Sequence, residues 1–359
     1  MTSLSQPVSC ADVHAHAVPQ ALLDMLVRGE ARFPHVAVRA AEGPRAEGLS
    51  IVFGEQPPTR PVAPGLTDVG RRREWMAANG VTCQVIGGWL DMFGYELPPA
   101  EGRDWAGLLT AQLAELAAGE PGLVPLGTVA LQDPAAAADA LTAQRGTGLR
   151  GVMISTRPGG FELDDPRLRP FFEAADDTEA VVYLHPGFGS ASARYHDYGL
   201  VNGLGRLEDT TVALARALYD GIPERYPRMR LVVAHGGGSL PMVLGRLRRN
   251  HAINPTTTKD PMASFAALYF DSVVFDPLAL EFLLRRAEPG HVMLGSDYPF
   301  PIGDLNPVEV VRRARLGDEQ RGGVLLGTAE SVFGLPPSLA GPPEGVPDST
   351  SASSQARVL

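Results

Sequence analysis

Two histidines separated by a single residue, His14 and His16, are the first side chains in the sequence that could do chemistry. They belong to the segment Asp12–His16 (DVHAH), at the end of an apolar run, Val8–Val13, that predicts a β-strand. Because residues two apart in a strand point to the same side, both imidazoles can face one ion. Neutral imidazole binds zinc and similar divalent metals. Two unrelated histidines would give the same spacing, so this pair alone does not establish a metal site.

Three later apolar runs each end in a residue that could bind a metal or move a proton. His185 ends the run VVYLH, His235 ends LVVAH, and Asp297 follows VMLGS. In a barrel of parallel strands the C-terminal strand ends converge, so these three side chains would meet His14 and His16. A single histidine is more often a hydrogen-bonded core residue, but five such residues at strand ends indicate a metal-dependent active site.

The elements that would position these residues alternate between two patterns. Short runs rich in β-branched residues are separated by segments with helical apolar spacing, which indicates parallel strands with helices outside them. Eight such units over roughly 300 residues favour a closed (β/α)8 TIM barrel, and an open doubly wound sheet is the alternative. The predicted strands are Val8–Val13, Val81–Gly87, Leu123–Leu131, Leu149–Ser155, Ala180–Leu184, Met229–Ala234, Ala267–Val274 and His291–Gly295.

Helix starts are marked by Asp-Pro pairs, in which the aspartate can cap the helix and the proline suits its first turn. The pairs are Asp133-Pro134, Asp165-Pro166 and Asp276-Pro277. A run of three arginines, 71–73, precedes Trp75 and predicts the solvent-facing side of another helix.

Two segments depart from this alternation. Residues 34–67 are rich in Pro, Gly and Arg and predict an insertion over the barrel mouth, after the first strand. From 336 to 359 the chain turns to Pro, Ser and Gly, which predicts a disordered tail. The expected organisation is therefore one barrel domain over residues 1–335, followed by the tail.

Charge and cysteine content narrow the partners and the compartment. The formal charge of -10 and the lack of a basic run argue against a nucleic-acid partner. No run approaches membrane-spanning length, and the first residues lack the basic and apolar parts of a signal peptide. Cys10 and Cys83 lie inside apolar runs, which suits a reducing compartment better than a disulfide framework. We expect a cytoplasmic protein without a membrane or nucleic-acid partner.

The glycine run after His235 (HGGG) admits a second chemical interpretation, an esterase oxyanion loop. The sequence has no G-x-S-x-G segment that could supply the nucleophile, so close backbone approach at the barrel rim is the better explanation. The sequence has one lysine, Lys259, and none in the fourth predicted strand (GLRGVMIST). Because two-metal barrels often bridge their ions with a lysine after that strand, a single ion is favoured.

Together these residues resemble the decarboxylase branch of the amidohydrolase superfamily, from about Val8 to Leu335. The resemblance implies a TIM barrel, a homodimer and a small carboxylate substrate. The chain departs from the pattern at Gly187, where the family carries a tryptophan, and in the loop that follows. The motifs that carry the resemblance are DVHAH (Asp12–His16), TRPV (Thr59–Val62), MFGY (Met92–Tyr95), HPG (His185–Gly187), AHGGGSLPMVLGRL (Ala234–Leu247), FDSVVFDPLAL (Phe270–Leu280) and LGSDYPFPIGD (Leu294–Asp304).

Roles for individual residues follow from the resemblance. Arg60 matches an arginine that grips the substrate carboxylate, and Arg246 matches a second one that the neighbouring subunit supplies. His235 matches the general base and acid, with Asp297 also catalytic. The implied ligands of one Zn²⁺, or of Mn²⁺ or another divalent transition metal, are His14, His16, His185 and Asp297.

These roles describe a non-oxidative decarboxylase of a small unsaturated or aromatic carboxylic acid. A catalytic metal lowers the pKa of its bound water from about 15.7 toward about 7, so metal-bound hydroxide would be the nucleophile. His235 would accept the proton and return it to carbon, and arginines would pair with carboxylates bidentately. Two alternatives remain: a C–C bond hydrolase or hydratase using the same mononuclear site, and a binding barrel that has lost its activity.

Overall fold

The computed structural model describes residues 9–41, 48–187 and 192–335. In these ranges eight parallel strands form two hydrogen-bonded sheets, one of three strands and one of five. Isolated bridges from Ala15 to Tyr298 and from Gly127 to Val152 join the two sheets and close the barrel. The predicted TIM barrel is therefore confirmed. Its strands are β1 (Cys10–Ala17), β4 (Val81–Gly88), β5 (Leu123–Pro125), β6 (Gly151–Ser155), β7 (Val181–His185), β8 (Arg230–Val233), β9 (Tyr269–Asp271) and β10 (Val292–Met293).

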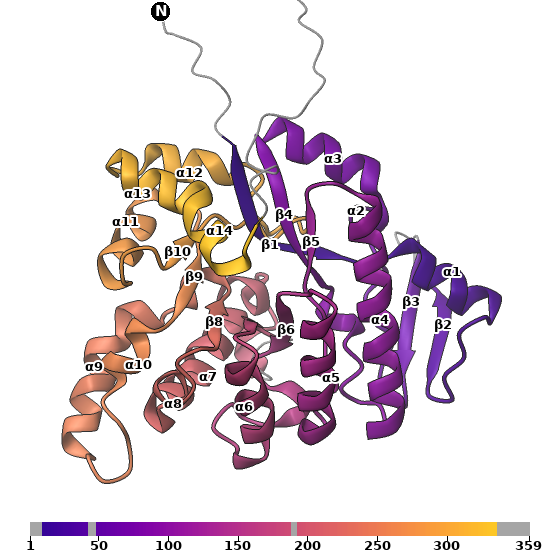
Figure 1. The fold of residues 1–359 in the computed structure, drawn as a ribbon, viewed down its shortest axis with the longest axis horizontal. Coiled ribbons are helices and arrows are strands. Elements are labelled where there is room, and N and C mark those ends of the chain that lie inside the picture. Colours follow the sequence, from indigo (N-terminus) through magenta and orange to yellow (C-terminus); the bar gives the residue numbers. More distant parts are fainter. Residues whose placement is uncertain (1–8, 42–47, 188–191, 336–359) are drawn as a thin grey trace, which may run out of the picture.

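Helices surround the barrel (Figure 1), and two of them begin at predicted Asp-Pro pairs. The Asp133 carboxylate accepts a hydrogen bond from the Ala136 amide at 3.3 Å, and Asp276 accepts one from the Leu278 amide at 2.9 Å. The third pair begins a 3-10 turn that leads into α6. The helices are α1 (Gln20–Arg28), α2 (Pro64–Thr67), α3 (Val69–Ala78), α4 (Pro99–Gly119), α5 (Pro134–Gly146), α6 (Arg169–Asp177), α7 (Arg206–Asp220), α8 (Ile222–Arg225), α9 (Leu240–Ile253), α10 (Pro261–Ala266), α11 (Pro277–Arg286), α12 (Pro307–Arg313), α13 (Asp318–Gly322) and α14 (Thr328–Phe333).

The alternation of side chains along β7 shows how the fold aims a functional residue. Val182 packs in an apolar cluster with helix residues such as Phe171, on the outside of the strand. Tyr183 points to the other side, where its ring centroid lies 5.4 Å from that of His14. Since side chains two apart share a face, His185 follows Tyr183 inward, at the C-terminal end of the strand.

The span predicted as an insertion contains an antiparallel hairpin, β2 (Val36–Ala40) with β3 (Leu49–Phe53). The hairpin packs on α4, because the Phe53 ring meets the Trp105 ring edge-on at 5.2 Å. Just beyond it, Thr59 is tied to Ile51 by two hydrogen bonds, one from its amide at 2.8 Å and one to its hydroxyl at 2.9 Å. The hairpin therefore fixes the backbone that carries the next residue, Arg60.

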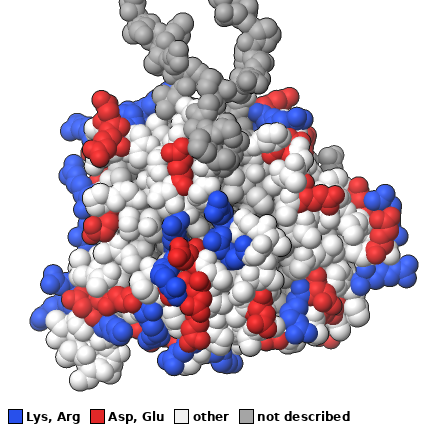
Figure 2. Space-filling view, viewed as in Figure 1, with Lys and Arg blue, Asp and Glu red and all other residues white. Residues whose placement is uncertain are grey.

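The surface and the helix lengths bear on the predicted partners. On the face shown in Figure 2, acidic and basic residues are interspersed rather than gathered into one basic surface. Within the described ranges, every helix is too short or too polar to cross a bilayer. Val8 and the predicted tail from 336 to 359 lie outside the described residues, so the predicted division between domain and tail stays a prediction.

Candidate metal centre and active site

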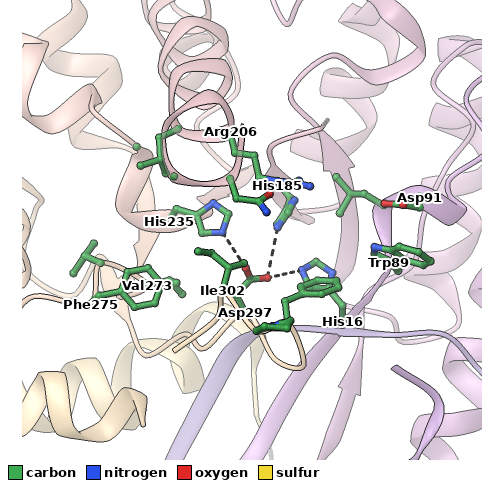
Figure 3. A pocket seen from close by; sticks show the side chains of 18 of the residues that line it. His16, Trp89, Asp91, His185, Arg206, His235, Val273, Phe275, Asp297 and Ile302 are labelled. Carbon is green, nitrogen blue, oxygen red and sulfur yellow. Dashed lines mark hydrogen bonds and ion pairs between the residues drawn. The ribbon is translucent and has the colours of Figure 1, made fainter. Parts of the chain in front are cut away.

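All five predicted strand-end residues meet at the C-terminal mouth of the barrel. His14, His185, His235 and Asp297 each offer a ligand atom, and these atoms lie within 4.8 Å of one another. The fifth residue, His16, places its Nε2 atom 3.2 Å from His14 Nε2 and 3.1 Å from Asp297 Oδ1. Figure 3 shows His16, His185 and His235 converging on Asp297 from different sides. The structure thus brings together residues from β1, β7 and the ends of β8 and β10.

The outer nitrogen of each predicted histidine ligand is already used. Nδ1 of His14 contacts the Asp271 carboxylate at 2.6 Å, while Nδ1 of His16 and of His185 contact backbone carbonyls at 3.3 and 2.9 Å. These oxygens only accept, so each Nδ1 carries the hydrogen and each Nε2 carries a lone pair. The lone pairs of His14 and His16 face each other, and buried His185 Nε2 has no hydrogen-bond partner among the described residues. A metal ion between these nitrogens would satisfy all three lone pairs.

The spacing of these atoms suits a small transition-metal ion. Asp297 Oδ1 lies 3.3 Å from His14 Nε2, 3.1 Å from His16 Nε2 and 3.9 Å from His185 Nε2. Ligand atoms bound tetrahedrally at 2.0–2.1 Å are about 3.4 Å apart. Three imidazoles and a carboxylate also form a donor set that such ions accept. The residues present therefore fit one divalent ion.

The electrostatics of the site also call for positive charge. Burial acts to lower the pKa of His14, but Asp297 and Asp271 raise it to about 10. Burial acts to raise the pKa of Asp297, but His14 and the other imidazoles hold it well below its usual value. Burial lowers the pKa of His185 well below its usual value, which keeps this imidazole neutral. A positive charge among these groups is therefore stabilised, whether a proton or a metal ion supplies it.

His235 occupies a different side of Asp297 from the three other histidines. Its Nε2 lies 3.4 Å from Asp297 Oδ2, whereas the others approach Oδ1. The backbone turns sharply here, with φ of 55° at His235. A Cβ atom on Gly236 would lie 2.6 Å from Val274 Cγ1, and one on Gly237 would lie 2.8 Å from Phe270 Cε1. The glycine run therefore serves close packing, as the sequence predicts.

Asp271, at the end of β9, connects the predicted metal ligand His14 with the turn that begins at His235. Its Oδ2 accepts from His14 Nδ1 at 2.6 Å, from the Tyr183 hydroxyl at 3.0 Å and from the His235 amide at 3.0 Å. Its Oδ1 accepts from the Gly236 amide at 2.9 Å. These bonds, His14 first among them, outweigh burial and hold the pKa of Asp271 at about 2. Asp271 thus orients both a predicted ligand and the predicted base.

A buried polar network supports β1 from behind and corrects one prediction. Arg72, expected on the solvent side of its helix, is only 2% exposed. It donates to Gln84 Oε1 at 2.6 Å and to the His16 carbonyl at 2.5 Å. Gln84 in turn donates to Asp12 at 2.8 Å, and Asp12 accepts from the His14 amide at 3.0 Å. Burial of the guanidinium is possible because both of its terminal nitrogens donate to buried acceptors.

A cavity of about 760 Å³ opens onto the cluster. His16, His185, His235 and Asp297 contribute to its lining, so the candidate metal ligands and the base face the same space. Apolar side chains make up much of the remaining wall, including Trp89, Val273, Phe275, Phe300 and Ile302. A volume of this size accommodates a small organic molecule.

The predicted arginines separate in the structure. Arg60 lines the cavity, where its guanidinium pairs with Asp91 at 3.1 and 3.3 Å and lies 5.2 Å from the Trp89 ring centre. Burial, partly offset by Arg60, raises the pKa of Asp91. Arg246 is exposed on α9 and does not belong to the cavity lining of its own chain. Its predicted role in a neighbouring subunit stays a prediction.

Three charged or aromatic cavity residues were not predicted from the sequence: Trp89, Asp91 and Arg206. Trp89 and Asp91 follow directly on the C-terminal end of β4, so the rule that strand ends face the mouth could have found them. Arg206 is the first residue of α7 and follows no strand directly, so no local signal marks it.

The fold and the site define a class: a (β/α)8-barrel enzyme with a candidate metal-binding site at its C-terminal mouth. More specifically, the chain belongs to the amidohydrolase family, whose model matches residues 96–335. It is 30% identical over 269 residues to 2-amino-3-carboxymuconate-6-semialdehyde decarboxylase from Dictyostelium discoideum, covering 72% of this chain and 74% of that enzyme. This similarity confirms the predicted resemblance to the decarboxylase branch and the enzyme class of carboxy-lyase.

Solved structures confirm the fold. The crystal structure of 5-carboxyvanillate decarboxylase from Sphingomonas paucimobilis matches with a TM-score of 0.75 and 23% identity, over 92% of this chain and 100% of that one. The same enzyme from Novosphingobium aromaticivorans, complexed with manganese and 4-hydroxy-3-methoxy-5-nitrobenzoic acid, matches with a TM-score of 0.73 and 22% identity, over 91% and 96%.

Proposed function

We propose that this chain catalyses the metal-dependent, non-oxidative decarboxylation of a small unsaturated or aromatic carboxylic acid. The observation that carries the proposal is the convergence of three imidazole lone pairs and Asp297 beside an aromatic cavity that holds an arginine. The names of the similar proteins, an aminocarboxymuconate semialdehyde decarboxylase and carboxyvanillate decarboxylases, support the same reaction class.

His14, His16, His185 and Asp297 would hold the ion. When bound, a divalent ion supplies Lewis-acid chemistry and lowers the pKa of a coordinated water, which makes hydroxide available near neutral pH. Zn²⁺ suits three imidazoles and one carboxylate, and the manganese complex of a structural neighbour supports Mn²⁺ as the other candidate. Asp271 and two backbone carbonyls would keep the three imidazoles aimed at the ion.

His235 would move the proton at its Nε2 atom. Asp297 Oδ2, 3.4 Å away, orients the ring without using the carboxylate oxygen that faces the other histidines. In the forward reaction His235 would first take a proton during activation of the nucleophile. The hydroxide so formed would add to the unsaturated system, and His235 would return its proton to the carbon that bears the carboxylate. When the carbon–carboxylate bond breaks, CO2 would leave, and the electron pair of that bond would re-form the double bond and expel the hydroxide, which would take up a solvent proton to give water. The exchange balances without an oxidant or an organic cofactor.

Arg60 would bind the substrate carboxylate. Its guanidinium is half exposed to the cavity and is held by Asp91 and the Trp89 face, which fixes its plane. A planar guanidinium can form two parallel hydrogen bonds to a carboxylate, so this position suits an acid that lies along the aromatic wall.

The direct test is CO2 release by purified, metal-loaded protein from a panel of aromatic and unsaturated acids. We expect at least one acid to lose CO2, a chelator to abolish the reaction, and Zn²⁺ or Mn²⁺ to restore it. Full activity after exhaustive chelation, with no bound metal by elemental analysis, would overturn the proposal.

Hydration or hydrolysis at the same site is the second candidate. It is supported by similarity to a 2-keto-4-carboxy-3-hexenedioate hydratase from a Sphingobium strain, which is 21% identical over 200 residues, or 52% of this chain and 57% of that enzyme. Mass spectrometry of the product separates the two reactions, because decarboxylation removes CO2 and hydration adds water. A product heavier than its substrate by one water would replace decarboxylation as the function.

We further propose a homodimer in which Arg246 completes the partner's site. Met242, one turn before Arg246 on α9, is 72% exposed. Residues four apart on a helix are surface neighbours, and Met and Arg side chains are both enriched at protein–protein interfaces. Mixing inactive His235→Ala and Arg246→Ala chains tests this directly. If the arginine acts across the interface, about a quarter of the sites regain both residues and activity returns. Failure of exchanged dimers to recover activity would contradict the shared site.

We also propose that the protein is cytoplasmic and that it consists of one domain and a tail. Cys10 and Cys83 are both buried free thiols, which suits a reducing compartment. We propose one barrel domain over residues 1–335, with 336–359 as a tail. Limited proteolysis would test the division, and cleavage within the barrel before the tail would contradict it.

A further inference from the structure

Arg206 enters the cavity from a helix that the predicted chemistry does not use. It begins α7 and is half-buried at the mouth of the barrel. Its Nε donates to Asn202 Oδ1 at 2.8 Å, and its Nη1 donates to the Gly187 carbonyl at 2.8 Å. Gly187 lies two residues beyond His185, so Arg206 is anchored beside the candidate metal centre (Figure 3). The side chain is therefore held in place before any substrate arrives.

Two guanidinium groups consequently face one cavity. Burial lowers the pKa of Arg206 and the positive charge of Arg60 lowers it further, whereas Asp297 and Asp91 act to raise it. An arginine remains charged despite such shifts. Placing two like charges at a partly buried site is unfavourable unless an anion shared between them offsets the repulsion.

The charges around the cavity define what that anion should be. Among the described residues that line it, the charged side chains are Arg60, Arg206, Asp91 and Asp297, and these cancel. A divalent ion held by the histidines and Asp297 would add positive charge, which a metal-bound hydroxide would offset in part. Two guanidinium groups that line one cavity with such an ion favour an anionic substrate, and each guanidinium can pair with a separate carboxylate. The apolar side chains that line the same cavity favour a flat or unsaturated body joining the two groups.

We propose that Arg206 is a specificity-determining residue that binds a second carboxylate of the substrate, so that this chain selects dicarboxylic acids over monocarboxylic acids of similar size. The inference rests on the proposed function for the identity of the first carboxylate, the one released as CO2. Arg60 then binds the carboxylate that is released and Arg206 binds the carboxylate that stays, while His235 faces the bond that breaks.

Equilibrium binding to metal-loaded protein tests the role of Arg206 without turnover. The probes are benzoate, isophthalate (benzene-1,3-dicarboxylate) and 3-hydroxybenzoate, measured by isothermal titration calorimetry. We expect wild-type protein to bind isophthalate about tenfold or more tightly than benzoate, as for a charge-assisted hydrogen bond. Arg206→Gln should reduce that ratio to about one by weakening isophthalate binding, with benzoate affected by less than about twofold. Arg206→Lys, which keeps the charge but loses the planar fork, should give an intermediate ratio.

Arg216→Gln is the matched control, because Arg216 lies on the same helix, pairs with Asp164 at 2.7 Å and does not line the cavity. It should bind all three probes as wild type does, and thermal melting should show that each variant is folded. Equal binding of benzoate and isophthalate by wild type, or an equal loss of both in Arg206→Gln, would overturn the proposal. If 3-hydroxybenzoate depends on Arg206 as strongly as isophthalate does, the recognised group is a hydroxyl and the dicarboxylate assignment is wrong.

The binding test and the CO2 assay can each give a negative result without the other, so the two proposals are tested separately. An Arg206-dependent preference for isophthalate in a protein that releases no CO2 would leave the specificity residue in place and remove the proposed reaction. CO2 release without any Arg206-dependent preference would keep the reaction and remove this inference.

Discussion

Each end of the barrel has a cavity lined with charged and histidine side chains, but the two cavities differ in how these side chains are hydrogen-bonded. The hollow at the N-terminal end has a volume of about 360 Å³ and is lined by Arg228, Arg230, Tyr269 and His291, among others. Arg230 begins β8 and Tyr269 begins β9, so this hollow lies opposite the mouth.

At the N-terminal end the polar groups have protein partners. Arg230 donates to two carbonyls of α14 at 2.6 and 2.8 Å, Arg228 pairs with two aspartates, and the His291 ring stacks on Tyr269 with centroids 4.1 Å apart. At the mouth, by contrast, buried His185 Nε2 and His235 Nδ1 have no hydrogen-bond partner among the described residues. Unpaired imidazole nitrogens therefore distinguish the cavity at the mouth from the cavity at the N-terminal end.

The largest effect that would test this comparison is expected for His185→Ala. The substitution removes one of the converging lone pairs, so we expect loss of bound metal and a fall in kcat of about 1000-fold or more. Elemental analysis and the CO2 assay measure the two effects. Retention of stoichiometric metal with near-normal kcat would show that the unpaired nitrogen at the mouth is not a ligand.

His235→Ala should separate proton transfer from metal binding. Because Nε2 of His235 approaches the oxygen of Asp297 that the other histidines do not use, metal content should stay close to that of wild type. Activity should fall by about 100-fold to 10,000-fold, the contribution of a general acid or base. Metal loss equal to that of His185→Ala would instead make His235 a full ligand.

Asp271→Asn should give a smaller effect on both quantities. The amide keeps the shape but can no longer accept equally from His14, Tyr183 and the backbone amides. We expect metal affinity or kcat to fall by about 10-fold to 100-fold, as for other residues that orient a metal ligand. Competition with a chromophoric chelator measures the affinity. Unchanged affinity and kcat would show that His14 needs no such orientation.

Arg230→Ala should have the smallest effect on activity, because its bonds join β8 to α14 at the opposite end. We expect the free energy of unfolding to fall by about 1–3 kcal/mol, with kcat per folded molecule unchanged. Urea denaturation followed by circular dichroism measures the stability. A loss of kcat in a fully folded Arg230→Ala protein would remove the proposed division of labour between the two ends.

Much of the fold and the core of the site could be predicted because local patterns determine them. Eight predicted runs overlap the barrel strands, although β5, β9 and β10 are shorter than predicted, and the strand-end rule places His185, His235 and Asp297 together. The first strand is longer than predicted: β1 runs to Ala17, since His14 and His16 are buried inside the barrel, where hydropathy alone suggests a polar strand end.

What could not be predicted depends on contacts between distant segments. Nothing in the run of three arginines distinguishes Arg72, which is buried only because Gln84 and the His16 carbonyl lie within its reach. Arg206 likewise reaches the cavity because α7 begins beside it, one loop after the end of β7. The roles of Arg60 and Arg246 come from family resemblance, and only the position of Arg60 in the cavity is visible in a single chain.

The tight turn after His235 has a consequence for protein engineering. Side chains at 236 and 237 would collide with Val274 and Phe270, so randomising these positions would mostly yield unfolded library members. Phe275 and Ile302, by comparison, line the same cavity and are 52% and 49% exposed. A directed-evolution campaign for new acids would therefore do best to vary these two rim residues and leave the turn untouched.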